Sequence, residues 1–151
     1  PVAEGAAKYY KFQSNYIDVR NDPLYPFGYG LSYTTFSYGD IQLSADHIAR
    51  DGSVTASVTV TNTGRRDGDE VVQLYIHHPA ARIARPVKEL KGFRRVHLKA
   101  GESRRIDFTV TPDMLKYKDG NGHDVLDAGV YDIMVGPNSS DKALKTSTLK
   151  L

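Results

Sequence analysis

The stretch Val54-Thr55-Ala56-Ser57-Val58-Thr59-Val60-Thr61 alternates small apolar residues with hydroxyl-bearing residues. Successive side chains of a β-strand point to opposite faces of its sheet, so this period of two predicts a strand with one packed face and one face toward water. Asp51-Gly52 precedes the stretch, and Asn62-Thr63-Gly64 follows it, where asparagine and glycine tolerate left-handed backbone geometry at small cost. The stretch therefore predicts one strand of an antiparallel sheet that is solvated on one side.

The rest of the chain, from about Thr34 onward, repeats this alternation between turn signals at short intervals. Further strands are predicted at residues 72–76, 89–98 with a bulge at Gly92, 106–110, 125–126, 131–135 and 144–151. Residues 119–122 (Asp-Gly-Asn-Gly) predict a tight reversal, and residues 111–113 (Thr-Pro-Asp) predict a single helical turn. Because helical periodicity is nearly absent, we predict an all-β, immunoglobulin-like antiparallel β-sandwich of about seven strands with an irregular N-terminal extension. The missing cysteine pair and tryptophan of antibody domains favour the fibronectin type III-like branch.

The composition is that of one folded domain. A chain of 151 residues with 40% hydrophobic and 25% charged residues is long enough for one core, and this composition does not indicate disorder. No apolar run approaches the roughly 20 residues of a spanning helix, so no membrane partner is expected. The chain has no cysteine, which excludes disulfides, thiolate zinc sites and cysteine nucleophiles. It begins at Pro1 rather than Met, and we interpret it as a mature, processed or truncated product.

The net charge of +2 hides a basic stretch between residues 82 and 105. Nine lysines and arginines lie there beside two acids, Glu89 and Glu102. A nucleic-acid surface would have this charge, but exposed strand faces with alternating charges would have it too. No aromatic-rich recognition motif is interleaved with the basic residues, so no nucleic-acid partner is expected.

The first 32 residues lack sustained periodicity, yet they hold seven of the 15 aromatic residues. A buried aromatic side chain gains on the order of 1.5–3 kcal/mol, so this segment is expected to pack on something large. Two interpretations remain open: the segment is a tail or linker shaped by a neighbouring domain, or it wraps one end of the sandwich itself. Gly28 and Gly30 flank Tyr29 and allow positive φ or a close approach to another surface.

Two stretches carry a resemblance to a known family. Residues 23–36 read Pro-Leu-Tyr-Pro-Phe-Gly-Tyr-Gly-Leu-Ser-Tyr-Thr-Thr-Phe and resemble the segment that joins the α/β sandwich to the last domain in β-glucosidases of glycoside hydrolase family 3. Residues 58–64, 68–75 and 85–93, the last reading Arg-Pro-Val-Lys-Glu-Leu-Lys-Gly-Phe, resemble the fibronectin type III-like domain of the same family. With Gly-Val-Tyr-Asp-Ile-Met-Val-Gly at residues 129–136, the resemblance covers about residues 15–151.

The resemblance implies two units: a linker or tail from the preceding α/β sandwich domain at residues 1–33, and a fibronectin type III-like domain at residues 34–151. It implies a non-catalytic carboxy-terminal module that stabilises the catalytic domains of an enzyme hydrolysing terminal β-D-glucosyl residues. The implied partners are the upstream barrel and α/β sandwich domains of the same enzyme, and a homodimer is compatible with the resemblance. The implied location is periplasmic or secreted. The side chains expected to contact these domains are Tyr25, Phe27, Tyr29, Leu31, Tyr33 and Arg85.

Retaining glycosidases use two carboxyl groups about 5–5.5 Å apart, and the resemblance implies that both lie upstream of this chain. The family's nucleophile is an aspartate in a Ser-Asp-Trp type motif, whereas this chain has no tryptophan and its single Ser-Asp, Ser140-Asp141, precedes Lys142. The five histidines lack the spacing of a zinc site, and residues 119–130 lack the glycine and glutamate positions of a calcium loop. We therefore expect no catalytic residue, no metal site and no cofactor in this chain.

An alternative of another class is a free-standing module that binds carbohydrate or protein. Its tyrosine rings would stack on sugars if they are not covered by protein. The candidate rings are Tyr9, Tyr10, Tyr16, Tyr25 and Tyr29. A third hypothesis is that a loop of this chain rims the active site of a full enzyme, but no residue pattern locates such a loop.

Overall fold

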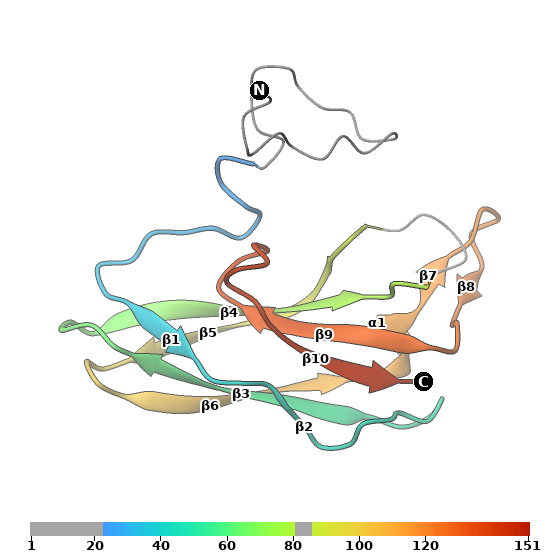
Figure 1. Ribbon diagram of the computed structural model, residues 1–151, viewed down its shortest axis with the longest axis horizontal. Helices are drawn as coiled ribbons and strands as arrows, with labels where there is room; N and C mark the ends of the chain where they lie inside the picture. The colour runs from blue at the N-terminus through green and yellow to red at the C-terminus, as the bar shows by residue number, and fades with distance from the viewer. Residues whose placement is uncertain (1–22, 81–85) are drawn as a thin grey trace, which may run out of the picture.

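The computed structural model describes residues 23–80 and 86–151 (Figure 1). Two four-stranded antiparallel sheets form its two layers. The first sheet consists of β1 (Phe36–Tyr38), β2 (Gln42–Leu43), β3 (Val54–Asn62) and β6 (Ser103–Val110). The second sheet consists, in spatial order, of β10 (Lys145–Lys150), β9 (Val130–Gly136), β4 (Gly68–His77) and β5 (Glu89–Leu98). The predicted all-β, fibronectin type III-like antiparallel sandwich is confirmed.

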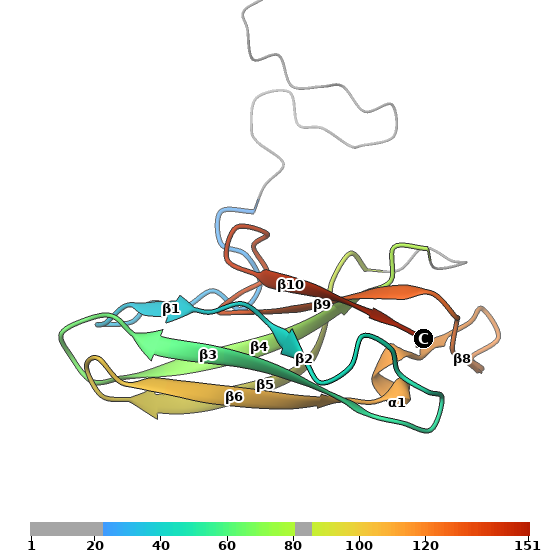
Figure 2. The same ribbon diagram turned by 60° about the horizontal axis from the view of Figure 1, so that its bottom comes forward.

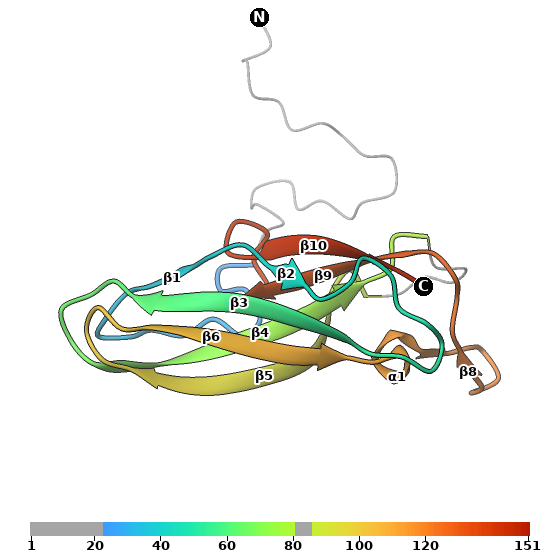
Figure 3. The same ribbon diagram turned by 90° about the horizontal axis from the view of Figure 1, so that it is seen from below.

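A helical turn, α1 (Pro112–Leu115), and a short hairpin, β7 (Tyr117–Lys118) with β8 (Asp124–Val125), lie together at one end of the sandwich. The β3–β4 and β5–β6 connections lie at the opposite end, as Figure 2 and Figure 3 show from two further directions. Asp119 Oδ1 accepts hydrogen bonds of 2.9 Å from the backbone N–H groups of Asn121 and His123, and these bonds close the predicted reversal. No helix among the described residues is long and apolar enough to cross a membrane.

The core lies between the two sheets and is built from the alternating rows that the sequence predicts. The buried apolar residues of the first sheet are Val54, Ala56, Val58, Val60, Ile106, Phe108 and Val110. Those of the second sheet are Val72, Leu74, Ile76, Val96, Leu98, Tyr131, Ile133, Val135 and Leu149. Val58 pairs with Ile106 across β3 and β6, so the two rows of the first sheet lie in register. Each of these large side chains gains about 1.5–3 kcal/mol from burial, which makes the core the main stabilising contribution.

A buried tyrosine fixes the corner that leads into β9. Tyr131 is fully buried, and its hydroxyl donates a 2.6 Å hydrogen bond to the backbone carbonyl of Asp127, four residues earlier. The Asp127 carboxylate in turn accepts a 2.8 Å hydrogen bond from the hydroxyl of Tyr117 in β7. A tyrosine hydroxyl bonded to the preceding backbone at a strand corner is a hallmark of immunoglobulin-like sandwiches. This contact joins the β7–β8 end to the core.

The structure adds short strands that the sequence pattern did not predict. β1, β2 and β7 have only two or three residues each, which is too short for a period of two to be recognised. The predicted bulge in β5 is confirmed, because Leu74 pairs with Gly92 while the next residue, Tyr75, pairs with Leu90. Lys91 is therefore the extra residue on the bulged strand.

The prediction that residues 62–64 end this strand is confirmed, because β3 ends at Asn62, but the backbone there is not left-handed. No described residue other than glycine has a positive φ, and Gly64 is not among the glycines that do. Asn62 is instead fully buried, and its side-chain amide bridges several backbone segments. Its Nδ2 donates to the carbonyls of Arg66 at 2.8 Å and Leu98 at 3.1 Å. Its Oδ1 accepts from Thr34 Oγ1 at 2.7 Å and from the backbone N–H of Gly64 at 3.0 Å.

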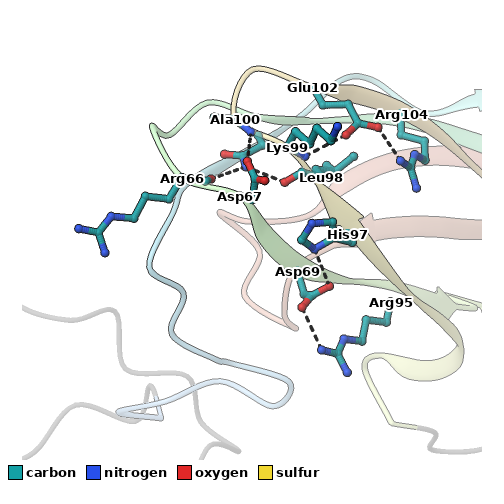
Figure 4. Close-up of polar contacts among 11 residues, drawn as sticks. Arg66, Asp67, Asp69, Arg95, His97, Leu98, Lys99, Ala100, Glu102 and Arg104 are labelled. Carbon is teal, nitrogen blue, oxygen red and sulfur yellow. Dashed lines mark hydrogen bonds and ion pairs between the residues drawn. The ribbon is translucent and has the colours of Figure 1, made fainter.

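Ion pairs neutralise much of the basic stretch between residues 82 and 105. The described pairs are Arg95–Asp69, Lys88–Asp141, Lys91–Glu89, Arg104–Glu102 and Arg105–Asp107. Figure 4 shows Arg95 and His97, two positions apart on β5, both directed at Asp69 of β4. Arg82 and Arg85 lie outside the described residues. Paired charges of both signs on exposed strand faces account for the local composition.

Candidate interdomain surface

The aromatic segment, defined here as residues 23–33, contains a tight turn. The backbone N–H of Tyr29 donates to the carbonyl of Pro26 at 3.1 Å, and Gly28 has a φ of 78°. This is the geometry of a type II turn, which requires a positive φ at its third position and therefore favours glycine there. The sequence prediction that Gly28 permits a positive φ is confirmed.

Gln73 of β4 holds this turn against the outer face of the second sheet. Its Nε2 donates to the carbonyls of Gly28 at 3.1 Å and Pro137 at 2.6 Å. Its Oε1 accepts a 2.5 Å hydrogen bond from the hydroxyl of Tyr75. A Cβ atom on Gly28 would lie 2.1 Å from Gln73 Oε1, so an alanine here would push the Gln73 amide away from its hydrogen-bond partners.

A third segment, the β9–β10 connection, completes the anchoring. The backbone N–H of Ser139 donates to the carbonyl of Phe27 at 2.9 Å, and its own carbonyl accepts from Lys88 Nζ at 2.9 Å. Lys88 Nζ also pairs with the carboxylate of Asp141. We call the group Phe27, Gly28, Gln73, Lys88 and Ser139 the clasp. Figure 1 shows the start of the described chain, in blue, beside the red loop that joins β9 to β10.

The clasp holds the backbone of the aromatic segment at its turn, residues 26–29, but most of the segment's apolar side chains stay exposed. Their exposed fractions are 94% for Tyr33, 89% for Leu31, 87% for Leu24, 67% for Phe27, 66% for Tyr25 and 45% for Tyr29. The rings of Tyr25 and Tyr29 contact each other, with centroids 5.3 Å apart and planes tilted by 35°. The segment does contact the sandwich, yet the sandwich does not bury its rings. Clustered exposed apolar groups of this kind mark interaction surfaces.

The exposed apolar surface continues from the aromatic segment onto the second sheet. A hollow of about 450 Å³ is lined by Phe27, Tyr75, Val87, Lys88, Leu90 and Ser139. Tyr75 and Gln73 point to the outer face of the sheet, and their partners on β5 are Leu90 and Phe93. Phe93 is 68% exposed and Val87 is 70% exposed. The hollow and its rim therefore form an exposed, mainly apolar surface next to the clasp.

Five of the six contact residues predicted from the sequence lie on this surface, namely Tyr25, Phe27, Tyr29, Leu31 and Tyr33. Arg85 lies outside the described residues, as do Tyr9, Tyr10 and Tyr16 of the alternative sugar-stacking set. The contacts of Gln73, Lys88 and Ser139 were not predicted from the sequence. Each is polar and stands where a solvent-facing side chain or turn is expected, so no local signal marks its contact with a distant segment.

Among the described carboxyl groups with a resolved shift, Glu70 is the one whose pKa is raised. Burial raises the pKa of Glu70 and outweighs the opposing hydrogen bond from Tyr38. That bond runs from the Tyr38 hydroxyl to Glu70 Oε1 at 2.7 Å, and burial raises the Tyr38 pKa far above its usual range. The partner of this carboxyl group is thus a phenol rather than a second carboxylate. No group of three or more potential metal ligands occurs in residues 23–80 and 86–151.

The sequence and the structure of this chain match those of known proteins. Residues 70–139 match the model of the fibronectin type III-like domain. The chain is 45% identical over 130 residues to a periplasmic β-glucosidase of Salmonella typhimurium, covering 86% of this chain and 17% of that protein. It is 46% identical over 127 residues to a β-xylosidase of Formosa agariphila, covering 84% of this chain and 18% of that protein.

A solved structure agrees with these sequence relatives. A β-glucosidase from Erythrobacter marinus superposes with a TM-score of 0.86 at 41% identity, covering 91% of this chain and 18% of that chain. This chain therefore spans less than a fifth of the length of each of these three relatives. The two facing sheets, the tyrosine corner and these matches show that the chain belongs to the fibronectin type III-like domains of glycoside hydrolase family 3 β-glucosidases and β-xylosidases.

Proposed function

We propose that this chain is a non-catalytic carboxy-terminal module of a family 3 β-glucosidase-type enzyme, and that its aromatic segment contacts the catalytic domains. The observation that carries the proposal is the contrast within residues 23–33. The clasp anchors the turn at Phe27 and Gly28 through hydrogen bonds from Ser139 and Gln73, while the nearby Leu31 and Tyr33 expose about nine tenths of their surface. An anchored turn beside exposed apolar side chains suits docking, because the anchored part loses little conformational entropy when a partner covers it.

The same proposal divides the chain into a linker from a preceding domain at residues 1–33 and a sandwich domain at residues 34–151. β1 begins at Phe36, close to this division. Hydrolysis of terminal β-D-glucosyl residues would then belong to domains outside this chain, which are also its partners. A periplasmic or secreted location is proposed on the basis of the periplasmic relative in Salmonella. The stabilising role follows from the area that the exposed side chains would bury.

A chimaeric enzyme tests the docking part of the proposal. This chain would replace the matching 130 residues of the Salmonella typhimurium β-glucosidase, to which it is 45% identical. We expect Leu31→Asp and Tyr33→Asp to lower the melting temperature and the activity of the chimaera, since each buried apolar side chain contributes about 1.5–3 kcal/mol. In the isolated chain the same substitutions should change the unfolding free energy by less than about 0.5 kcal/mol. A chimaera that tolerates both substitutions would contradict the proposal.

Activity measurements test the non-catalytic part. We expect the purified chain to hydrolyse neither aryl β-glucosides nor aryl β-xylosides. Turnover above buffer that persists through repurification would contradict this expectation. The alternative of sugar stacking on tyrosine rings is tested in parallel by titrating cello-oligosaccharides. Tyr25 and Tyr29 cover part of each other at a tilt of 35° and do not form one flat platform, which favours a protein partner over a sugar for these rings.

A further inference from the structure

A bulge interrupts the edge of the first sheet, on the side of β3 that faces away from β6. β1 ends opposite Val60, and β2 begins opposite Ser57. Residues 39–41 therefore stand opposite residues 58–59, three against two, which is the arrangement of a β-bulge. Bulges of this kind redirect side chains and are frequent beside functional sites.

The bulge carries an acidic side chain out of the sheet edge. The backbone N–H of Gly39 donates to the carbonyl of Thr59 at 2.9 Å, which anchors the start of the bulge. The Asp40 side chain is 95% exposed, and its Oδ1 lies 3.5 Å from Lys145 Nζ, a long contact at the surface. Exposed ion pairs of this kind contribute little energy, so the Asp40 carboxylate is available to another hydrogen-bond donor.

An arginine from β6 lies across the outer face of β3, next to the bulge. Arg105 Nε donates to Asp107 Oδ1 at 2.9 Å, and its Nη2 donates to Ser57 Oγ at 2.7 Å. Ser57 is only 3% exposed although it belongs to the outer face of the sheet. The Ser57 hydroxyl and the Arg105 guanidinium both hold the pKa of Asp107 below its usual range, so Asp107 stays ionised. The guanidinium is therefore held in place while its charge is balanced.

Between the bulge and this arginine lies a polar hollow of about 280 Å³. It is lined by Gly39, Asp40, Gln42, Ser57, Val58, Thr59 and Arg105. We propose that the polar hollow binds one neutral, hydroxyl-rich ring, such as a single monosaccharide unit. Asp40 supplies hydrogen-bond acceptors, Arg105 supplies donors, and the side chains of Gln42 and Thr59 supply both. Vicinal hydroxyl groups, which donate and accept at once, match this set.

Charge and size exclude other ligand classes. The charges around the hollow balance, because Asp40 lies beside Lys145 and Asp107 pairs with Arg105, so neither an anion nor a cation meets a net opposite charge. An apolar ligand finds no partner, because Val58 is 1% exposed and the other lining side chains are polar. Pockets for drug-sized ligands span about 300–1,000 Å³, so this hollow is suited to one ring rather than to an oligosaccharide.

Titration of the ¹⁵N-labelled chain with D-glucose, D-xylose and inorganic phosphate tests this site. We expect saturable chemical-shift changes with either sugar at residues 39–42, 57–59 and 105, and none with phosphate. Saturable changes with phosphate alone would overturn the proposal in favour of an anion site. Changes that grow linearly with sugar concentration, or that gather at Tyr25 and Tyr29, would overturn it as well.

Two exposed side chains allow a test by substitution that leaves the fold intact. We expect Asp40→Ala and Gln42→Ala each to weaken sugar binding, and Asp40→Ala to weaken it about tenfold, because a hydrogen bond to a charged group is lost. Asp51→Ala, at an exposed acid in the connection from β2 to β3, is the matched control and should leave the affinity unchanged. Equal affinity in all three variants would overturn the assignment. Peaks away from the hollow should coincide with those of the unmodified chain, which verifies that the fold is retained.

Discussion

Asn62 Oδ1 accepts a 2.7 Å hydrogen bond from Thr34 Oγ1, and this bond joins the entry into β1 to the end of β3. The two residues are 28 positions apart, and both are buried. Asn62 Nδ2 reaches the carbonyls of Arg66 and Leu98, so one amide connects three segments at the same end of the sandwich. All the donors and acceptors of its side chain are used, which is how a buried amide avoids an unsatisfied polar group.

We predict that Asn62→Ala lowers the unfolding free energy by about 2–4 kcal/mol, because it leaves buried carbonyls without donors. Asn62→Asp keeps the shape but replaces the donating nitrogen with an acceptor that faces those carbonyls, so it should be at least as destabilising. Urea denaturation measures both values. Asn121→Ala, at an exposed turn position, is the control and should change stability by less than about 0.5 kcal/mol. An Asn62→Ala effect as small as the control would contradict this role.

Gly28 and Gly30 form a matched pair for testing the clasp. Gly28→Ala forces a side chain into the left-handed region and against Gln73, and we expect a loss of about 1–2 kcal/mol. Gly30→Ala meets no atom within 4 Å and should be neutral. Hydrogen exchange of the Ser139 amide, which donates to Phe27, reports the opening of the clasp directly. Equal exchange rates in the two variants would show that the clasp does not depend on Gly28.

The core was predictable because its rows alternate within single strands. In β3 and β6, every second residue points into the core. This alternation is visible in the sequence without knowledge of the folded structure. The clasp was not predictable, since Gln73 contacts residues 45 and 64 positions away. The burial of Asn62 was not predictable for the same reason: asparagine near the end of a strand fits a turn, and only the packed structure shows its amide buried.

The exposed side chains of the candidate interdomain surface could be predicted from the sequence, and the polar residues that anchor it could not. Tyr25, Leu31 and Tyr33 are large aromatic or apolar residues in a segment without strand periodicity, and this pattern predicts a contact surface. Lys88 lies in a stretch whose charge suggested a solvated face, yet its ammonium is drawn to the backbone of Ser139. A long basic side chain can point its charge into water or bind a distant backbone carbonyl. Composition alone therefore does not distinguish a solvated lysine from one that anchors another segment.

The tyrosine corner gives a third prediction. Tyr131→Phe removes the 2.6 Å hydrogen bond to the Asp127 carbonyl but keeps the ring, which stacks on His78 at a centroid distance of 4.2 Å. We expect the unfolding free energy to fall by about 1–3 kcal/mol, since the carbonyl loses its donor in a buried place. Thermal unfolding with and without the substitution measures this change. No loss of stability would contradict a stabilising role for this hydrogen bond.

The contact between Tyr38 and Glu70 predicts a pH dependence of stability. Burial raises the pKa of Glu70 above its ordinary value of 4.5, so the folded state binds this proton more tightly than the unfolded state does. The resulting stabilisation is present below pH 4.5 and is lost as the pH rises through the folded pKa. Glu70→Gln cannot ionise and still accepts from the Tyr38 hydroxyl. We therefore expect the unfolding free energy of the variant to rise relative to that of the unmodified chain between pH 4 and pH 7. Urea denaturation at several pH values in this range measures both free energies. A difference between the two chains that does not change with pH would contradict the raised pKa of Glu70.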